Sequence, residues 1–474
     1  MKKVLSNFVY QSSFQLMKII IPIITIPLVS KALGPYGIGE FNYINSISQY
    51  FILLSTLGLN LYGNREISIN RDDTIQMSKR FWEIFLIQVF TSIISLILYS
   101  LLVIYLIKDN YLLYSIQGLV IISSIVDISW FFMGIEDFKK ISVTNMIINI
   151  LGFILIIRWI KTPSDLWLYI LIQALTIFLS QSIVWFFLFD KITIVRVEFS
   201  DLKRHLKPSI VYFIPKISIV LYTNINKTLL GALSSKTDVG FYTNAVVLNT
   251  VFVTLLTTLD LVLMPKMSNL FSKSKQNEML SVLEKSIHAQ LFFSIALVFG
   301  MWTVYEKLSF WFFGESFEGI EKYIPWLSIL IIIIPLGMAI SRQYLLPSNQ
   351  IKSFNTSVIN GAIVSVVINI LLIPLIGIYG AIIATIVAET FVTVTRTYYL
   401  VKNTSFTFDF IQIVKNIFSG FLMLIITRYL TRNFSATILT TITQGLIGVI
   451  VYMSLTIIFK SNPIHKMYKE QKGI

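Results

Sequence analysis

Residues 209–240 read SIVYFIPKISIVLYTNINKTLLGALSSKTDVG, an apolar stretch with polar residues at regular intervals. Ser209, Tyr212, Lys216, Thr223 and Lys227 follow one another at steps of three, four, seven and four residues. Because a helix has about 3.6 residues per turn, these five side chains share one face. A charged seam on an otherwise apolar helix is unfavourable against lipid but acceptable beside a water-filled cavity. The stretch therefore predicts a membrane helix that lines a cavity, where we expect the protein to work.

The composition of the chain indicates an integral membrane protein. Hydrophobic residues make up 55% and charged residues 13% of its 474 residues, and the mean hydropathy is +0.77. Soluble domains carry about 25% charged residues. Cysteine is absent, which excludes a disulfide framework, a thiolate metal site and a cysteine nucleophile. The first apolar segment contains Lys18 and has no small-residue cleavage site, so we interpret it as a retained helix.

Apolar runs of about 20 residues, the length that spans a bilayer as a helix, recur along the chain. The expected spans cover residues 12–33, 41–63, 81–106, 111–134, 141–160, 166–189, 208–233, 239–264, 286–305, 323–346, 354–374, 377–400, 411–431 and 436–459. These continuous runs are unlike the short alternating segments of a transmembrane β-barrel. The sequence thus predicts an all-α polytopic membrane protein with about 14 transmembrane helices.

Lysine and arginine in the connections predict that both termini are cytoplasmic. With that orientation, 25 of the 38 basic residues lie in inside segments, nine in outside segments and four within helices. The net charge of +14 is therefore a topology signal, with attraction to anionic membrane lipids as a secondary effect. It does not indicate a nucleic-acid partner.

Two short matches predict an internal repeat of six helices. Residues 32–41, ALGPYGIGEF, resemble residues 232–242, ALSSKTDVGFY, at an offset of 200–201 residues. Residues 138–142 match residues 351–355, which again pairs one helix with the helix six later. A repeat of six spans keeps its orientation, so the halves would be related by an axis along the membrane normal. Chance similarity among apolar helices is the alternative.

The repeat predicts two pseudo-symmetric six-helix bundles followed by two C-terminal helices. The expected divisions are residues 1–197 for the N-terminal lobe, 198–402 for the C-terminal lobe, and 403–474 for two additional helices and a cytoplasmic tail.

The candidate substrate-binding residues lie on polar faces of the expected helices. They are Lys18, Gln49, Lys216, Asn224, Lys227 and Arg342. Each Lys or Arg near the middle of a membrane costs at least about 2.5–3.5 kcal/mol, so Lys216 and Arg342 are expected to face a cavity. For Lys18 and Lys227, snorkelling to the interface is an equal alternative. Helix–helix packing also explains the uncharged polar residues.

Asp127, Asp260 and Glu389 are the acidic residues expected inside the membrane. They are candidates for pairing with the cations or for ion coupling, and the sequence favours neither role. The three histidines lie far apart, and neither a phosphate-binding glycine loop nor an HExxH motif occurs. We therefore expect neither an enzyme nor an ATP-driven pump, and no metal or cofactor.

Several segments, taken in order, resemble one family of membrane proteins. They are residues 31–35 with Gly39, residues 61–67, residues 221–233 followed by 239–242, residues 343–347, and residues 372–377 with Gly380 and Ala381. In these segments the chain is similar to the polysaccharide (O-antigen and capsule) flippases of the multidrug/oligosaccharidyl-lipid/polysaccharide exporter superfamily. The likeness covers essentially the whole chain. Such proteins often carry Asp before the basic residue of helix seven, where this chain has Asn226, so a role for that acid is not carried over.

The resemblance implies a flippase that moves oligosaccharides linked to undecaprenyl pyrophosphate by alternating access, for capsule, exopolysaccharide or O-antigen export. It also implies a place in the bacterial cytoplasmic membrane, with a polysaccharide polymerase and chain-length machinery as partners. The cationic seam suits a pyrophosphate head group on physical grounds.

Four alternative functions stay open, and one of them is a structural scaffold, which would not need charged seams. A multidrug exporter of the same superfamily is disfavoured by the intramembrane cations, whereas a lipid II flippase is harder to exclude. A membrane polysaccharide polymerase would be expected to have a large outer loop, and the connections of this chain are short.

Overall fold

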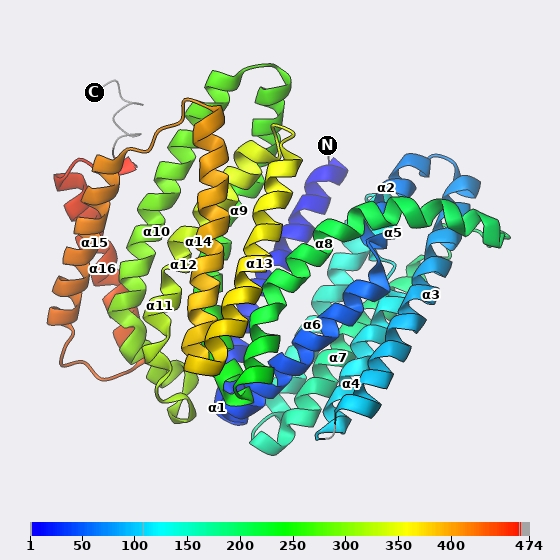
Figure 1. Ribbon diagram of the computed structural model, residues 1–474, viewed down its shortest axis with the longest axis horizontal. Helices are drawn as coiled ribbons and strands as arrows, with labels where there is room; N and C mark the ends of the chain where they lie inside the picture. Colours follow the sequence, from blue (N-terminus) through cyan, green and yellow to red (C-terminus); the bar gives the residue numbers. More distant parts are fainter. Residues whose placement is uncertain (1, 108, 464, 466–474) are drawn as a thin grey trace. The chain divides into compact units, whose positions relative to one another are not determined.

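The computed structural model describes residues 2–107, 109–463 and 465, and every regular element among them is helical (Figure 1). This confirms the all-α prediction. The first elements are α1 (Lys2–Thr56), α2 (Leu59–Asn70), α3 (Thr74–Leu106), α4 (Tyr111–Val126), α5 (Ser129–Gly134), α6 (Phe138–Trp159), η1 (Pro163–Asp165), α7 (Leu166–Ser182), η2 (Ile183–Phe187) and α8 (Phe199–Leu233). The others are α9 (Lys236–Ser272), α10 (Gln276–Phe313), η3 (Glu315–Phe317), η4 (Ile320–Lys322), α11 (Ile324–Ser328), α12 (Leu330–Ile340), the π-helix η5 (Ser341–Leu345), α13 (Ile351–Ile376), α14 (Ile378–Asn403), α15 (Phe410–Leu430) and α16 (Ile438–Ile458).

Among the described residues, twelve helical segments are long and apolar enough to cross a membrane, so the chain is a multi-pass membrane protein. The first of them, Ile20–Asn70, covers two predicted spans, because α1 consists of two helices that meet in a kink at the non-helical Gly34 (φ 66°, ψ −179°), between those spans. The predicted span 208–233 lies in α8, which is not among the twelve found in the described residues and which carries the charged seam. These two differences explain why fourteen spans were predicted and twelve such segments are found in the described residues.

The chain divides into two compact units, Met1–Gly231 and Ala232–Ile474. Most of α8 groups with the first unit, whereas the predicted lobe boundary lies at residues 197/198. A grouping by spatial proximity does not test a sequence repeat, so the repeat and its boundaries stay predictions.

An aromatic cluster packs α2, α3 and α5 of the first unit together. Trp130 and Phe81 are fully buried, and their ring centroids lie 5.4 Å apart. A Cβ atom added at Gly63 would lie 2.6 Å from the Trp130 ring, closer than atoms can pack. Glycine at this position therefore allows α2 to lie directly against Trp130. Trp130 Nε1 also donates to Gln88 Oε1 at 3.0 Å, which joins the cluster to the polar groups described below.

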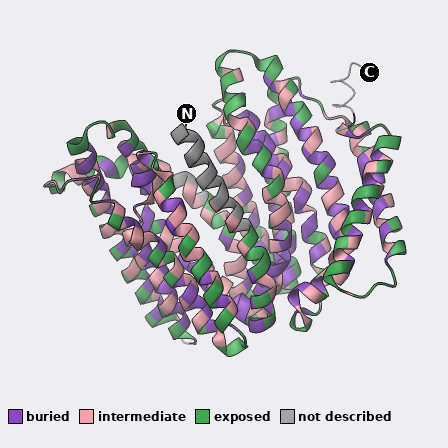
Figure 2. Cartoon of the chain, turned by 180° about the vertical axis from the view of Figure 1, so that it is seen from behind, coloured by how far each residue is buried: buried purple, intermediate pink, exposed green. Residues whose placement is uncertain are grey.

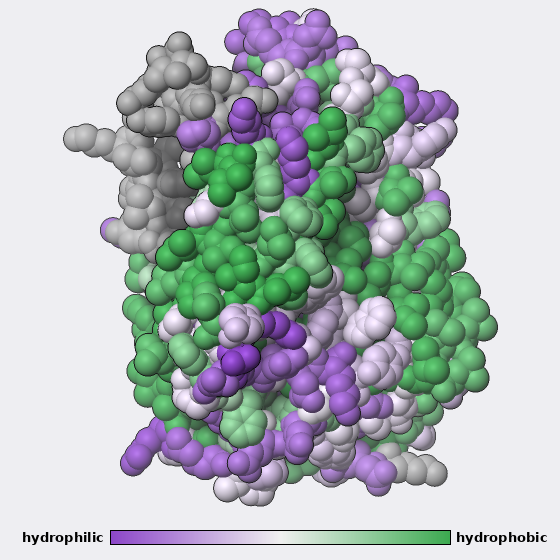
Figure 3. Space-filling view, turned by 90° about the vertical axis from the view of Figure 1, so that its left-hand side faces the viewer, coloured by the Kyte–Doolittle hydropathy of each residue, from purple (hydrophilic) through white to green (hydrophobic). Residues whose placement is uncertain are grey.

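In the second unit, α10 packs against α9, α12, α15 and α16. The outer sides of α15 and α16 carry exposed apolar side chains, among them Val414, Phe418, Val449 and Ile450. Figure 3 shows this face with apolar side chains over most of its middle and polar side chains gathered at both ends. Figure 2 shows exposed residues along the helices of each unit. Such a distribution is what a lipid-facing surface requires.

Candidate functional site

Lys216, the central residue of the predicted seam, is half-buried on α8 and lies at the end of α1. Its Nζ donates to Thr56 Oγ1 at 3.3 Å. Thr56 is the last residue of α1, where the final carbonyl groups have no partner within the helix. A cation is favourable beside this negative end of the helix dipole. The ammonium group is thus held by a hydroxyl and a helix end, without a full counter-charge.

A sharp break in the chain after Thr56 makes this approach possible. Leu57 and Gly58 both have positive φ, 40° and 76°. A Cβ atom at Gly58 would lie 2.5 Å from Ser209 O and 2.7 Å from Phe213 N, so the α8 backbone rests directly on this glycine. The break between α1 and α2 therefore fixes how α8 passes the end of α1.

Asp127 is the acid whose charge acts on Lys216, although no ion pair within 4 Å joins these two described residues. It follows the last residue of α4, and its Oδ1 accepts from Ser129 N at 3.0 Å. Gln88 Nε2 donates to the backbone oxygens of Ser124 (2.6 Å) and Asp127 (2.8 Å). The Gln88 amide therefore supplies hydrogen bonds to backbone carbonyl groups at the break between α4 and α5, as buried backbone groups require.

Further along α8, Thr228 lies against the second half of α1. Thr228 Oγ1 lies 2.9 Å from both Ser46 Oγ and Tyr50 OH, which joins the two helices. Asn224 Nδ2 donates to Val220 O at 3.0 Å, within its own helix. Thr228 thus joins α8 to α1, whereas the amide of the predicted residue Asn224 bonds within α8.

The remaining predicted residues of the first unit have separate surroundings. Gln49 Nε2 lies 3.4 Å from Asn45 Oδ1 on α1. Lys227 is half-buried, and its Nζ makes no hydrogen bond or ion pair with the residues that the structure describes. The side chain of Lys18 lies outside the described residues, so its predicted role stays a prediction.

In the second unit the predicted residue Asp260 lies at the centre of a buried polar cluster. Its side chain is fully buried on α9, and its Oδ1 accepts from Gln290 Nε2 (2.6 Å) and Gln343 Nε2 (2.7 Å). Arg342 is half-buried on η5, and its Nη1 donates to Thr257 O at 3.3 Å. The structure therefore places the two predicted residues near each other, because Arg342 of η5 is bonded to the turn of α9 that precedes Asp260. Glu389 lies half-buried on α14.

The sequence analysis missed a second buried acid, Glu83 of α3, which is fully buried. Its Oε2 lies 3.1 Å from Arg80 Nη1 and 2.7 Å from His205 Nε2, and its Oε1 pairs with Arg204. Tyr62 OH lies 2.7 Å from His205 Nδ1. Burial lowers the pKa of the His205 imidazole. The sequence did contain a signal for this cluster. Basic residues stand three and four positions before Glu83, at the start of an apolar helix.

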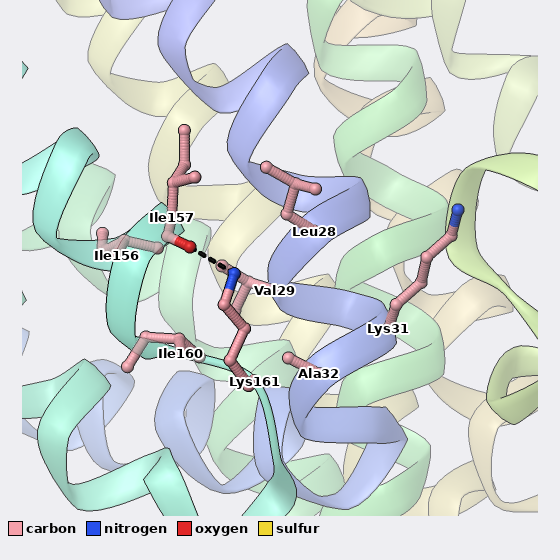
Figure 4. A pocket seen from close by; sticks show the side chains of 8 residues that line it. All are labelled: Leu28, Val29, Lys31, Ala32, Ile156, Ile157, Ile160 and Lys161. Atoms are coloured by element: carbon pink, nitrogen blue, oxygen red, sulfur yellow. Dashed lines mark hydrogen bonds between the residues drawn. The ribbon is translucent and has the colours of Figure 1, made fainter.

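A cavity of about 220 Å³ lies between α1 and the end of α6 (Figure 4). Its lining is mostly aliphatic, and Lys161 Nζ donates to Ile157 O at 2.5 Å within it. Lys31 also borders the cavity but extends away from Lys161, as Figure 4 shows. The predicted site residues do not line it, so this cavity is not the candidate site.

Comparisons with known proteins agree on one class of membrane protein. Residues 4–271 match the family model described as polysaccharide biosynthesis protein. A protein named "Putative O-antigen transporter" from Escherichia coli (strain K12) is 22% identical over 394 residues, 82% of this chain and 94% of that protein. A protein of the same name from Shigella dysenteriae is 22% identical over 373 residues, 78% of this chain and 92% of that protein.

Two solved structures share the fold. Lipid II flippase MurJ, in an inward closed conformation, superposes with a TM-score of 0.70 at 16% identity, over 95% of this chain and 98% of that one. An inward-facing multidrug resistance MATE family transporter of the MOP superfamily gives a TM-score of 0.62 at 13% identity, over 84% of this chain and 99% of that one. The fold is therefore that of these transporters.

Proposed function

Because the chain belongs to the polysaccharide biosynthesis protein family, we propose that it is a flippase for lipid-linked oligosaccharide repeat units. The substrate is an oligosaccharide on undecaprenyl pyrophosphate, and the polymer is a capsule, exopolysaccharide or O-antigen. The protein works in the bacterial cytoplasmic membrane with both termini on the cytoplasmic side. A polysaccharide polymerase and chain-length machinery act beside it.

The observation that carries this proposal is the position of Lys216. Its ammonium group lies at the end of α1 with one hydroxyl partner, Thr56 Oγ1 at 3.3 Å. An ammonium group has three donors, so Lys216 can still bind an anion. A pyrophosphate head group requires fixed positive charge and hydrogen-bond donors to replace its counterions and water.

The other predicted substrate-binding residues supply the remaining chemistry. Lys227 and Arg342 are further half-buried cations, and Lys18 is a fourth cation on α1. Gln49 and Asn224 offer amide groups of the kind that bind sugar hydroxyls. The lipid tail stays in the bilayer while the head group crosses, and alternating access comes from two states of the helical bundle.

A second candidate is a lipid II flippase, which the fold similarity to MurJ favours. Both candidate substrates carry a pyrophosphate on a lipid, so the cations suit either one. They differ in the sugar-containing head group and in the polymer that cells lose without the protein.

Deletion of the gene separates these functions. We expect surface polysaccharide to disappear while lipid-linked repeat units accumulate in the cytoplasmic leaflet, as measured by lipid extraction and accessibility to an impermeant sugar-modifying enzyme. Accumulation of lipid II with loss of peptidoglycan would identify the second candidate instead. Normal surface polysaccharide in a strain without another such flippase would contradict the proposal.

A further inference from the structure

The Asp260 cluster of the second unit contains buried oxygen atoms that lack a hydrogen-bond donor among the described residues. Gln290 Nε2 and Gln343 Nε2 both donate to Asp260 Oδ1, and Ser286 Oγ donates to Gln343 Oε1. Asp260 Oδ2 and Gln290 Oε1 are buried without a partner in the described part of the chain. One proton on the carboxyl group would turn Oδ2 from an unsatisfied acceptor into a donor. The two unpartnered oxygens therefore favour a neutral acid over a charged one at this position.

No cation neutralises the Asp260 carboxyl group directly. Its hydrogen-bond partners are two uncharged amides, and no ion pair within 4 Å reaches it from the described residues. An ionised carboxylate without a paired charge is strongly disfavoured in a buried, membrane-embedded position. Protonation removes this cost without any rearrangement of the two glutamines.

Charged groups on the elements around α9 leave this conclusion unchanged. Arg342 on η5 acts on Asp260 through its charge, while its Nη1 is bonded to Thr257 O. Arg396 of α14 is bonded to Gly337 O and Ser357 Oγ, and His288 of α10 accepts from Asp409 N. The other charged groups on these elements include Glu284 and Lys285, which are exposed on α10, and Glu389, which is half-buried on α14.

The cluster suits a proton better than a metal ion. Hard metal cations take about six or more oxygen ligands, or keep several waters. Asp260 Oδ2 and Gln290 Oε1 are two unpartnered oxygens, and the Arg342 charge nearby would repel a metal cation. Within the described residues, no group of three or more His, Cys, Asp or Glu could hold a metal ion.

The cluster also joins three separate elements, one of which is a π-helical turn. Gln343 belongs to η5, a π-helical turn between α12 and the loop before α13, and Gln290 belongs to α10. Single π-helical turns are frequent at functional sites. A small separation of η5 from α9 would break the Gln343 bond to Asp260 and admit water, which allows the proton to leave.

We propose that Asp260, held by Gln290 and Gln343, is a proton-binding site whose proton is exchanged with solvent during the transport cycle. The exchange during transport rests on the proposed flippase function, whereas the proton site does not. The alternative is a polar cluster that only joins three membrane helices.

The direct test is infrared difference spectroscopy of the full-length protein in lipid, recorded between neutral and acidic pH. We expect a carboxylic-acid carbonyl signal that Asp260→Asn removes. Asp73→Asn is the matched control, because Asp73 is an exposed helix cap for Ile75 N and Gln76 N that asparagine can replace. An unchanged signal in Asp260→Asn would overturn the proton site, as would a signal that responds to sodium at constant pH.

Two further measurements separate a proton site from a structural cluster. Gln343→Leu removes a donor to the charged form of the carboxyl group, so the midpoint of the infrared signal should move to higher pH. In cells, export by the wild-type protein should vary with external pH, while Asp260→Asn should lose that variation and Asp260→Glu should keep it. An unmoved midpoint, or a wild-type pH profile in Asp260→Asn, would overturn the proposal. Absence of any export phenotype on deletion would instead reject the flippase function and leave the infrared result standing.

Discussion

Glu83 in the first unit and Asp260 in the second are both fully buried carboxyl groups, but their neighbours differ in charge. Arg80, Arg204 and His205 surround Glu83, whereas Asp260 is bonded to two neutral glutamines. A buried acid among cations stays charged and joins the helices that supply them. A buried acid among amides is stable when it carries a proton. The comparison shows that surroundings, more than burial, decide whether an acid is an anchor or a titrating site.

Neutralising each acid by an isosteric amide should separate the two roles. Glu83→Gln removes the counter-charge of Arg80 and leaves Arg204 with Asp201 alone, at 3.8 Å, and we expect a loss of about 3 kcal/mol in the free energy of unfolding. This is the low end of the range for a broken buried pair, because the Arg204 side chain is 40% exposed and partly screened by water. Asp260→Asn resembles the protonated acid and should change stability by less than about 1 kcal/mol. The measurement is denaturant unfolding in detergent, and equal losses in both variants would contradict the comparison.

The stability of the Glu83 cluster should fall in acid through His205. Burial lowers the pKa of this imidazole in the folded protein, so the unfolded chain binds the proton more readily. The contribution to stability is complete above the ordinary histidine pKa of about 6.5 and is lost as the pH falls below it.

Unfolding curves recorded from pH 8 to pH 5 test this dependence, which should be shallower in His205→Gln than in the wild-type protein. His288→Gln is the matched control, because His288 is partly exposed and bonded to the Asp409 backbone amide. The His288→Gln variant should keep the pH dependence of stability that His205 causes. A slope that is the same in His205→Gln and in the wild type would show that the imidazole does not control the cluster.

The helical architecture could be predicted from the sequence because it depends on local composition. Fourteen apolar runs predicted the all-α membrane fold, and the spacing on residues 209–240 predicted one polar face on α8. The sequence also predicted where the first helix ends, because the non-helical Gly34, at which the two helices of α1 meet, lies between the predicted spans 12–33 and 41–63. Whether α8 belongs with the first or the second half depends on packing between distant segments, which a pattern along one helix does not contain.

The candidate site could be predicted only in part, for a similar reason. Charge inside an apolar helix identified Lys216, Asp260 and Arg342, but their partners lie far away in the sequence. Thr56, 160 residues before Lys216, supplies the only polar side chain bonded to it in the described part of the chain. Glutamines such as Gln290 occur in apolar helices for packing as well as for function, so the sequence does not show that two of them converge on Asp260.

The central claim is that Lys216 holds an anionic head group, and the most direct test is export in cells normalised to the amount of membrane protein. Lys216→Ala should abolish surface polysaccharide while leaving the protein amount unchanged, and Lys216→Arg should retain part of it. Lys216→Gln should behave like the alanine variant, because hydrogen bonding without charge does not replace the counterions of a pyrophosphate. Lys402→Ala, at an exposed lysine of α14, is the matched control and should export normally. Full export by both Lys216→Ala and Lys216→Gln would show that this lysine does not bind the substrate and would contradict the account.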